Sequence, residues 1–238
     1  MIDSKIETQN FVSFINSFKG ETFDELAISF NFHTKSKSKN ALLIKRIAEG
    51  YKGKEFFKTL IETNNLSTKT IQLLKNNKVK EAMSFPKFCY ESIIDESWKT
   101  SAAKQIFSKT FIFCVFKFSD DKNIFMGAFL WKMPKEDLNG EVRDMWEKTK
   151  NIIISGNIVK NAGNKIRLNF PKENETNICH VRPHGRNSLD LARLPERDTL
   201  TGFFGLPKHS FWLNHNYLNK VIQEHANMLL ADFVCYNK

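Results

Sequence analysis

The sequence contains few cysteines, and none of them forms a Cys-x-x-Cys pair. Cys89, Cys114, Cys179 and Cys235 lie far apart along the chain. This spacing indicates neither a zinc ribbon nor a disulfide framework. We therefore expect reduced, buried thiols in a cytoplasmic protein.

Long apolar runs are also lacking, and the longest ones are too short to cross a bilayer. The chain begins with polar and acidic residues, which is not the pattern of a signal peptide. Neither a Gly-rich phosphate loop nor a Gly-x-Ser-x-Gly elbow is present. We expect no membrane partner, because the alternative of a membrane-surface protein lacks an apolar anchor.

Acidic residues are outnumbered, with 26 Asp and Glu against 36 Lys and Arg, which gives a net charge of +10. Between Lys35 and Lys80 the sequence holds 12 Lys and Arg against 3 Glu. Such an excess favours a polyanionic partner, most often nucleic acid. The alternative is that the charge serves solubility alone.

The apolar residues are sufficient for a sizeable core and indicate one α/β domain over residues 1–238. Phe111–Phe116 is a continuous apolar run and predicts a central strand buried on both faces. Ile124–Trp131 is expected to return as its antiparallel partner. Helices are expected over Phe11–Phe18, Thr22–Phe30, Lys54–Thr63, Ser67–Lys75 and Asp95–Phe107, and from Asn40, Pro134 and about Asn216. The helix from Thr22 opens with a capping-box pattern, and the helix from Asn40 would turn Leu43, Ile44 and Ile47 inward. A long irregular loop is expected over Asn187–Gly205.

The stretch from Ile178 to His184 alternates apolar and polar residues, which predicts a strand. Cys179 and Val181 would face a core. The opposite face would then carry three nitrogen donors, from His180, Arg182 and His184. Such a face is suited to phosphate oxygens and base edges, although an ordinary solvated strand face is the alternative.

Further polar residues extend this candidate surface. Arg186 and Asn187 follow the strand directly, and an alternating segment that ends at Trp212 and Asn214 is expected to pair with it. Lys165 and Arg167 share the outer face of another alternating segment. A metal site built on the histidines with Cys179 is disfavoured, because Cys179 points to the opposite face.

Several short segments resemble the MutH / Sau-three-A-I family of GATC-specific endonucleases, and they occur in the same order and spacing. The similar segments are Gly20–Ala27, Ala128–Trp131, Met145–Glu147, Ile154–Gly156, Arg182–His184 and Phe211–Leu213. The resemblance implies a restriction-endonuclease-like fold, in which helices flank a mixed sheet. It also implies duplex DNA containing GATC as the partner. The basic residue after the Arg-Pro pair then reads bases, and His184 stands there where a Lys is usual. Trp212 likewise replaces a usual Tyr.

The family's catalytic segment is altered in this chain. Its pattern is Asp-Phe-Pro, four intervening residues, then Glu-x-Lys, and its carboxylates hold Mg²⁺. The matching stretch here begins with Ser84 in place of the Asp and ends with Ile93 in place of the Lys. Glu91 remains, and one carboxylate without partners is a poor Mg²⁺ site.

The resemblance is closest to the C-terminal, catalytically degenerate copy of a two-copy type II restriction endonuclease. This implies an effector domain that binds DNA, while Mg²⁺ serves the full enzyme and the N-terminal catalytic domain of the same chain does the cutting. We expect no catalytic residue, metal ligand or cofactor in this domain. The alternative is an active Mg²⁺-dependent endonuclease with a rearranged site, which would need carboxylate neighbours around Glu91.

Overall fold

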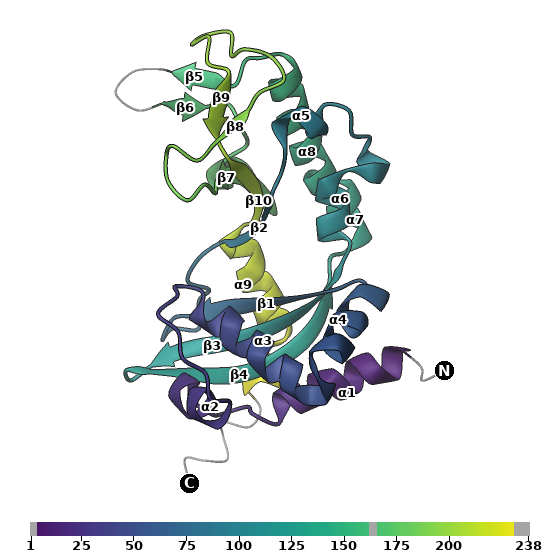
Figure 1. Ribbon diagram of the computed structural model, residues 1–238, viewed down its shortest axis with the longest axis vertical. Helices are drawn as coiled ribbons and strands as arrows, with labels where there is room; N and C mark the ends of the chain where they lie inside the picture. The colour runs from purple at the N-terminus through teal and green to yellow at the C-terminus, as the bar shows by residue number, and fades with distance from the viewer. Residues whose placement is uncertain (1–3, 162–165, 231–238) are drawn as a thin grey trace. The chain divides into compact units, whose positions relative to one another are not determined.

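The computed structural model describes residues 4–161 and 166–230, which group into two compact units (Figure 1). Unit 1 comprises Met1–Glu81, Lys109–Lys132 and Asn219–Lys238, and unit 2 comprises Ala82–Ser108 and Met133–Leu218. The single domain expected over residues 1–238 stays a prediction, and each unit is described by itself. The whole is mixed α/β, with small sheets and flanking helices, and is compatible with a restriction-endonuclease-like fold.

Unit 1 is built on a three-stranded mixed sheet in the order β1-β3-β4. Its strands are β1 (Leu66–Leu73), β3 (Thr110–Ser119) and β4 (Lys122–Lys132), and its helices are α1 (Ser4–Asn16), α2 (Phe23–Ser29), α3 (Lys39–Lys52), α4 (Lys54–Thr63) and α10 (Ala226–Leu230). Helix α9 (His215–Glu224) begins in unit 2 and continues into unit 1. β1 runs parallel to β3, and β4 runs antiparallel to it.

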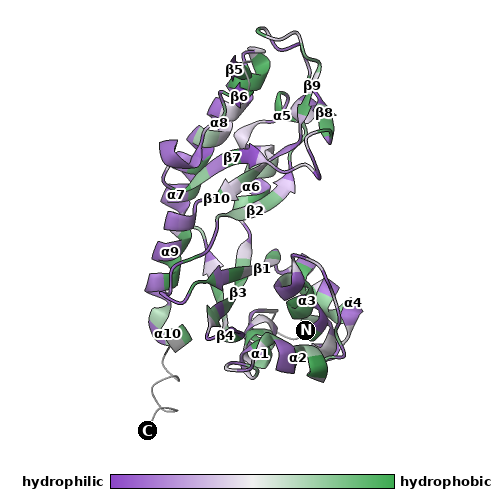
Figure 2. Ribbon diagram, turned by 90° about the vertical axis from the view of Figure 1, so that its left-hand side faces the viewer, coloured by the Kyte–Doolittle hydropathy of each residue, from purple (hydrophilic) through white to green (hydrophobic). Residues whose placement is uncertain are grey.

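The central strand forms as predicted, because every residue from Phe111 to Phe116 is buried. Its antiparallel partner and the capping box at Thr22 are confirmed as well. Leu43, Ile44 and Ile47 of α3 join the core, and green and purple residues alternate along this helix in Figure 2. The apolar periodicity of the helix therefore predicted its buried side correctly.

The helix predicted over Ser67–Lys75 is wrong, because these residues belong mostly to β1. The β-branched residues Thr68, Thr70 and Ile71 favour a strand. Pairing with β3 along the whole of β1 then overrides the helix start signal that Ser67 offers.

The outer edge of β4 is covered by the segment that follows α1. The Asn16 side chain bonds to both backbone groups of Ala128, accepting from its N–H at 2.6 Å and donating to its carbonyl at 2.9 Å. Gly20 N–H donates to the Phe125 carbonyl at 2.9 Å. Gly127 has φ +117°, and an added Cβ would lie 3.0 Å from Asn16 Oδ1, so this close approach requires glycine. These contacts satisfy backbone groups that an edge strand otherwise leaves open.

Unit 2 contains a three-stranded antiparallel sheet in the order β2-β10-β7 and two small two-stranded sheets. Its strands are β2 (Met83–Lys87), β5 (Val159–Asn161), β6 (Arg167–Leu168), β7 (Cys179–Pro183), β8 (Leu191–Arg193), β9 (Gly205–Pro207) and β10 (His209–Leu213). Its helices are α5 (Tyr90–Ile93), α6 (Ala102–Phe107), α7 (Lys135–Asn139) and α8 (Glu141–Ile154), with 3-10 turns η1 (Trp98–Thr100) and η2 (Glu173–Glu175).

An aromatic cluster forms the core of unit 2 on one face of its larger sheet. Phe88 stacks on Phe211 with ring centroids 4.8 Å apart, and Phe85 meets Phe107 at 4.9 Å. Cys179 and Val181 are buried on the same side, as the alternation predicted. The opposite face of β7 and β10 is therefore left for other contacts.

Two predictions in unit 2 need correction. The long irregular loop expected over residues 187–205 contains a short antiparallel pair, β8 and β9. The helix expected over Asp95–Phe107 is reduced to η1 and α6, since Ser101 interrupts it with extended backbone and caps α6 through its side chain. Among the residues that the structure describes, no helix combines the length and apolar character that a bilayer crossing requires.

Candidate nucleic-acid interface

The predicted pairing of the two alternating segments is confirmed. β7 and β10 are antiparallel, with Arg182 opposite Ser210 and His180 opposite Trp212. A backbone bond from His184 N–H to the Lys208 carbonyl, 2.7 Å long, extends the ladder by one residue. Paired residues share a face. We call the set Arg182, His184, Ser210 and Trp212 the recognition face.

The side chains of the recognition face contact one another around the indole ring. The Arg182 guanidinium carbon lies 5.2 Å from the Trp212 ring centroid, and the His184 ring lies 5.4 Å from it on a centroid basis. His184 Nδ1 is 2.8 Å from Ser210 Oγ, which fixes the imidazole orientation. Stacking keeps the guanidinium extended and its donor edge directed. This is the geometry required to approach a base edge or a phosphate.

The Trp212 indole N–H is buried and has no hydrogen-bond acceptor among the described residues. A buried donor without a partner is costly, by roughly 1–3 kcal/mol in general. This cost falls on the folded protein itself, because an atom with almost no accessible surface is not open to an incoming ligand.

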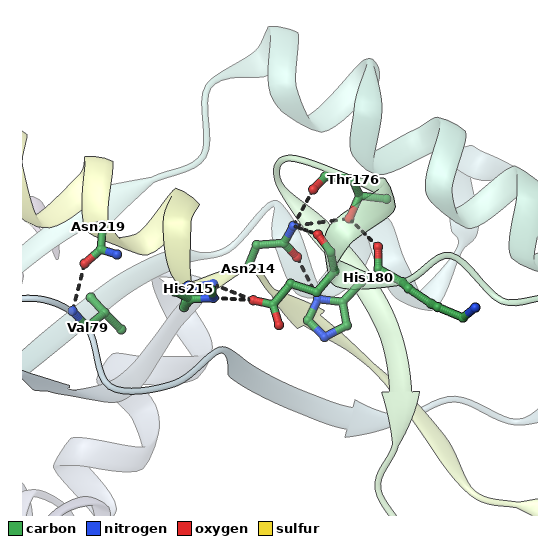
Figure 3. Close-up of polar contacts among 8 residues, drawn as sticks. Val79, Thr176, His180, Asn214, His215 and Asn219 are labelled. Atoms are coloured by element: carbon green, nitrogen blue, oxygen red, sulfur yellow. Dashed lines mark hydrogen bonds and ion pairs between the residues drawn. The ribbon is translucent and has the colours of Figure 1, made fainter. Parts of the chain in front are cut away.

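His180 lies at the inner end of this face and is buried, which corrects the expectation that it would be exposed. Its Nδ1 is 2.6 Å from Asn214 Oδ1, and the Asn214 amide nitrogen donates to the Thr176 carbonyl at 2.8 Å (Figure 3). Burial lowers the pKa of His180, and the hydrogen bond with Asn214 opposes that shift. The alternation of a strand shows on which face of the sheet a residue lies, but it does not show whether another part of the chain covers that face.

Asn214 was predicted to contact DNA, and the structure gives its side chain a different environment. Its residue is 2% exposed, and both ends of its amide are bonded within unit 2. Asn214 thus positions His180 and the turn around Thr176. His215, the next residue, bonds to Glu173 through Nδ1 at 2.6 Å.

Arg186 and Asn187 lie in the turn after β7, and both are exposed. Asn187 Oδ1 accepts the Leu189 N–H at 2.9 Å, so this side chain closes a local turn. The turn is held by Asp190, a residue that sequence reasoning missed. Asp190 accepts Arg186 N–H at 3.0 Å and Lys208 Nζ at 2.6 Å. The hydrogen bond from Lys208 holds the pKa of Asp190 well below its usual range.

The remaining predicted residues are Arg167 and Lys165. Arg167 is exposed on β6, which pairs with β5 and not with β7. Lys165 lies outside the described residues. Direct DNA contact by Arg182, His184, Arg186, Asn187, Lys165, Arg167 and Trp212 stays a prediction.

The stretch that matches the catalytic pattern does not form an Mg²⁺ site. Ser84 lies on β2 opposite Trp212, Ile93 is buried in the core, and Glu91 lies on α5. The Glu91 carboxylate is 3.4 Å from Arg193 Nε. Mg²⁺ needs several oxygen ligands in octahedral geometry, and an arginine beside the one carboxylate opposes such a cation. Over residues 4–161 and 166–230, no group of three or more His, Cys, Asp and Glu side chains is arranged to hold a metal ion.

The chain is a distant homologue of the type II restriction enzyme Sau3AI from Staphylococcus aureus. The two are 29% identical over 192 residues, which cover 68% of this chain and 39% of the enzyme. The chain thus spans well under half the length of this relative. No protein-family model matches the chain. The similarity supports a relation to restriction endonucleases.

Proposed function

We propose that this chain binds duplex DNA at GATC as the effector domain of a type II restriction endonuclease, without cutting DNA itself. The observation that carries the proposal is the recognition face, in which Arg182 and His184 are ordered around Trp212 on paired strands. Arginine can donate two parallel hydrogen bonds to guanine O6 and N7 in the major groove.

The absence of cutting is argued from the altered catalytic stretch. Ser84 and Ile93 supply no carboxylate and no ammonium group, and Glu91 is the one residue of the catalytic pattern that remains. Metal-assisted hydrolysis requires a cation that polarises the phosphate and activates water. In the proposal, an N-terminal catalytic domain of a longer protein supplies that chemistry with Mg²⁺. Binding of a further GATC site by this chain would raise the effective concentration of DNA at the cutting site.

The test is a gel shift on a duplex with one GATC and on a scrambled duplex, with and without Mg²⁺, followed by a denaturing gel. The proposal expects GATC-selective binding and intact strands under all conditions. Mg²⁺-dependent cleavage at GATC would instead establish the alternative, an active endonuclease with a rearranged site. Equal binding to both duplexes would remove the sequence specificity.

A further inference from the structure

The segment between β7 and β10 exposes an unusual amount of apolar surface. We call residues 187–207 the hairpin segment, because β8 and β9 pair within it. Among the large apolar side chains that the described residues expose, five belong to it: Leu189, Leu191, Leu200, Phe203 and Phe204. Leu189 is 82% exposed and Phe203 45%. Apolar side chains that gather on one exposed element mark a surface that another molecule covers.

Two arginines are interleaved with these apolar side chains. The Phe204 ring centroid lies 4.7 Å from the Arg193 guanidinium carbon and 5.4 Å from that of Arg197. Arg197 also donates to the Gly202 carbonyl at 3.0 Å. Arg193 is 67% exposed at its side chain and pairs with Glu91 across 3.4 Å, a pair that water weakens. Both cations are held at the surface by an aromatic ring.

The two aspartates of the hairpin segment point inward, which leaves its exposed surface mainly cationic. Asp198 is buried and accepts the N–H groups of Ile158 and Val159 at 3.0 and 2.7 Å. Asp190 holds Lys208 as described above. Glu196 is the exposed acid that opposes the arginines. Asp198 also anchors the segment to the backbone beside β5, so the apolar side chains are presented on a fixed loop.

We propose that the hairpin segment is a second DNA-contacting element, in which Arg193 and Arg197 bind backbone phosphates and Phe203 and Leu200 contact sugars or base steps. This inference rests on the proposed function of the recognition face. The segment begins four residues after the end of β7 and finishes two residues before the start of β10, so it lies within the connection between the two recognition strands.

Both kinds of side chain on this surface have a known use on duplex DNA. Guanidinium groups contact phosphates and fix the register of a protein on the duplex. Phe and Leu side chains can wedge between base steps or cover sugars. An arginine that leaves Glu91 for a phosphate exchanges one exposed charge partner for another.

The test measures DNA affinity against salt for the full chain on a GATC duplex with several flanking base pairs. The double variant Arg193→Gln/Arg197→Gln should lower the slope of log K against log salt by about 2, since each phosphate contact contributes roughly 0.9. The double variant Leu200→Ser/Phe203→Ser should weaken binding by about tenfold with the slope unchanged, because it removes apolar contact and no charge.

Matched controls are available on α8. Arg143 forms an exposed ion pair with Glu147 at 2.8 Å, and Ile154 is 52% exposed. Arg143→Gln and Ile154→Ser should leave affinity and slope unchanged. If the wild type binds DNA and the hairpin variants match these controls, the inference is overturned and the proposed function stands. If the wild type does not bind DNA, the inference and the proposed function are both overturned.

A protein partner would be recognised separately. Sedimentation velocity of the free chain should give the same coefficient for the wild type and for Leu200→Ser/Phe203→Ser. A coefficient that falls in the variant, with DNA binding unaltered, would mean that the surface joins copies of this chain, and it would overturn the DNA assignment.

Discussion

Unit 1 carries most of the net charge, whereas unit 2 carries the recognition face. The sequence ranges of unit 1 hold 20 Lys and Arg against 13 Asp and Glu, and those of unit 2 hold 16 against 13. Yet the recognition face lies wholly in unit 2. Charge supplies affinity that is independent of sequence, and directed donors supply selectivity. In the proposal, net charge therefore indicates the class of partner, and the recognition face supplies the selectivity.

The largest expected effect comes from Arg182→Ala, which tests whether the recognition face supplies the selectivity for GATC. Loss of a bidentate base contact should weaken binding to GATC by about 10- to 100-fold, corresponding to roughly 1–3 kcal/mol, with a much smaller effect on random DNA. Fluorescence anisotropy on both duplexes at one salt concentration measures this. Equal losses on both would reduce Arg182 to a phosphate ligand.

The core beneath the recognition face should be sensitive to pH through His209. This residue is buried, and its Nδ1 lies 2.6 Å from both the Tyr90 hydroxyl and the Pro207 carbonyl. Burial lowers the pKa of His209 to about 4, from 6.5 in the unfolded chain. The unfolded chain therefore binds the proton first, so stability is present above pH 6.5 and is lost as pH falls toward 4.

Between pH 7 and pH 5 the wild type should lose about 2 kcal/mol of unfolding free energy through this group. Denaturant unfolding of the wild type and of His209→Gln at both pH values isolates the effect. The variant is expected to be less stable at pH 7 but to show a smaller pH dependence. Parallel losses in the two proteins would mean that His209 is not the titrating group.

Asn16→Ala tests how much the covered edge of β4 contributes to the stability of unit 1. The change removes both bonds to the Ala128 backbone and should cost about 1–2 kcal/mol, because it leaves edge groups of β4 unpaired. Asn10→Ala, an exposed position on the same helix, is the control and should be neutral or slightly stabilising. Thermal melts of both variants give the comparison. Equal melting temperatures would mean that the bonds from Asn16 to Ala128 do not stabilise the edge of β4.

The smallest expected effect comes from the basic segment of unit 1. Lys35 and Lys37 are exposed in the connector before α3. Replacing both with Gln should lower the salt slope by up to about 2 and weaken GATC and scrambled duplexes alike. An unchanged slope would mean that this part of unit 1 does not touch DNA.

Local patterns predicted the strands that carry the candidate site and which way most of their residues face. Alternation sufficed for Cys179, Val181 and Arg182, because the period of a strand is two residues. It could not show that Asn214 and the turn at Thr176 bury His180, since those contacts join residues over 30 positions apart. Local patterns also did not reveal the Asp190 cluster, because its partner Lys208 lies 18 positions further along the chain. β1 was misread because its helix start signal was local and its strand partner was not.

The measurement that tests the account most directly is the ratio of the dissociation constants of the full chain for a GATC duplex and for its scrambled counterpart. It is made at fixed physiological salt with EDTA present, so that no metal contributes. The account predicts a ratio of at least about 10³ in favour of GATC, the lower limit usual for specific DNA-binding proteins, and a fall of about 10- to 100-fold in this ratio in Arg182→Ala. A ratio near one in the wild type would contradict it.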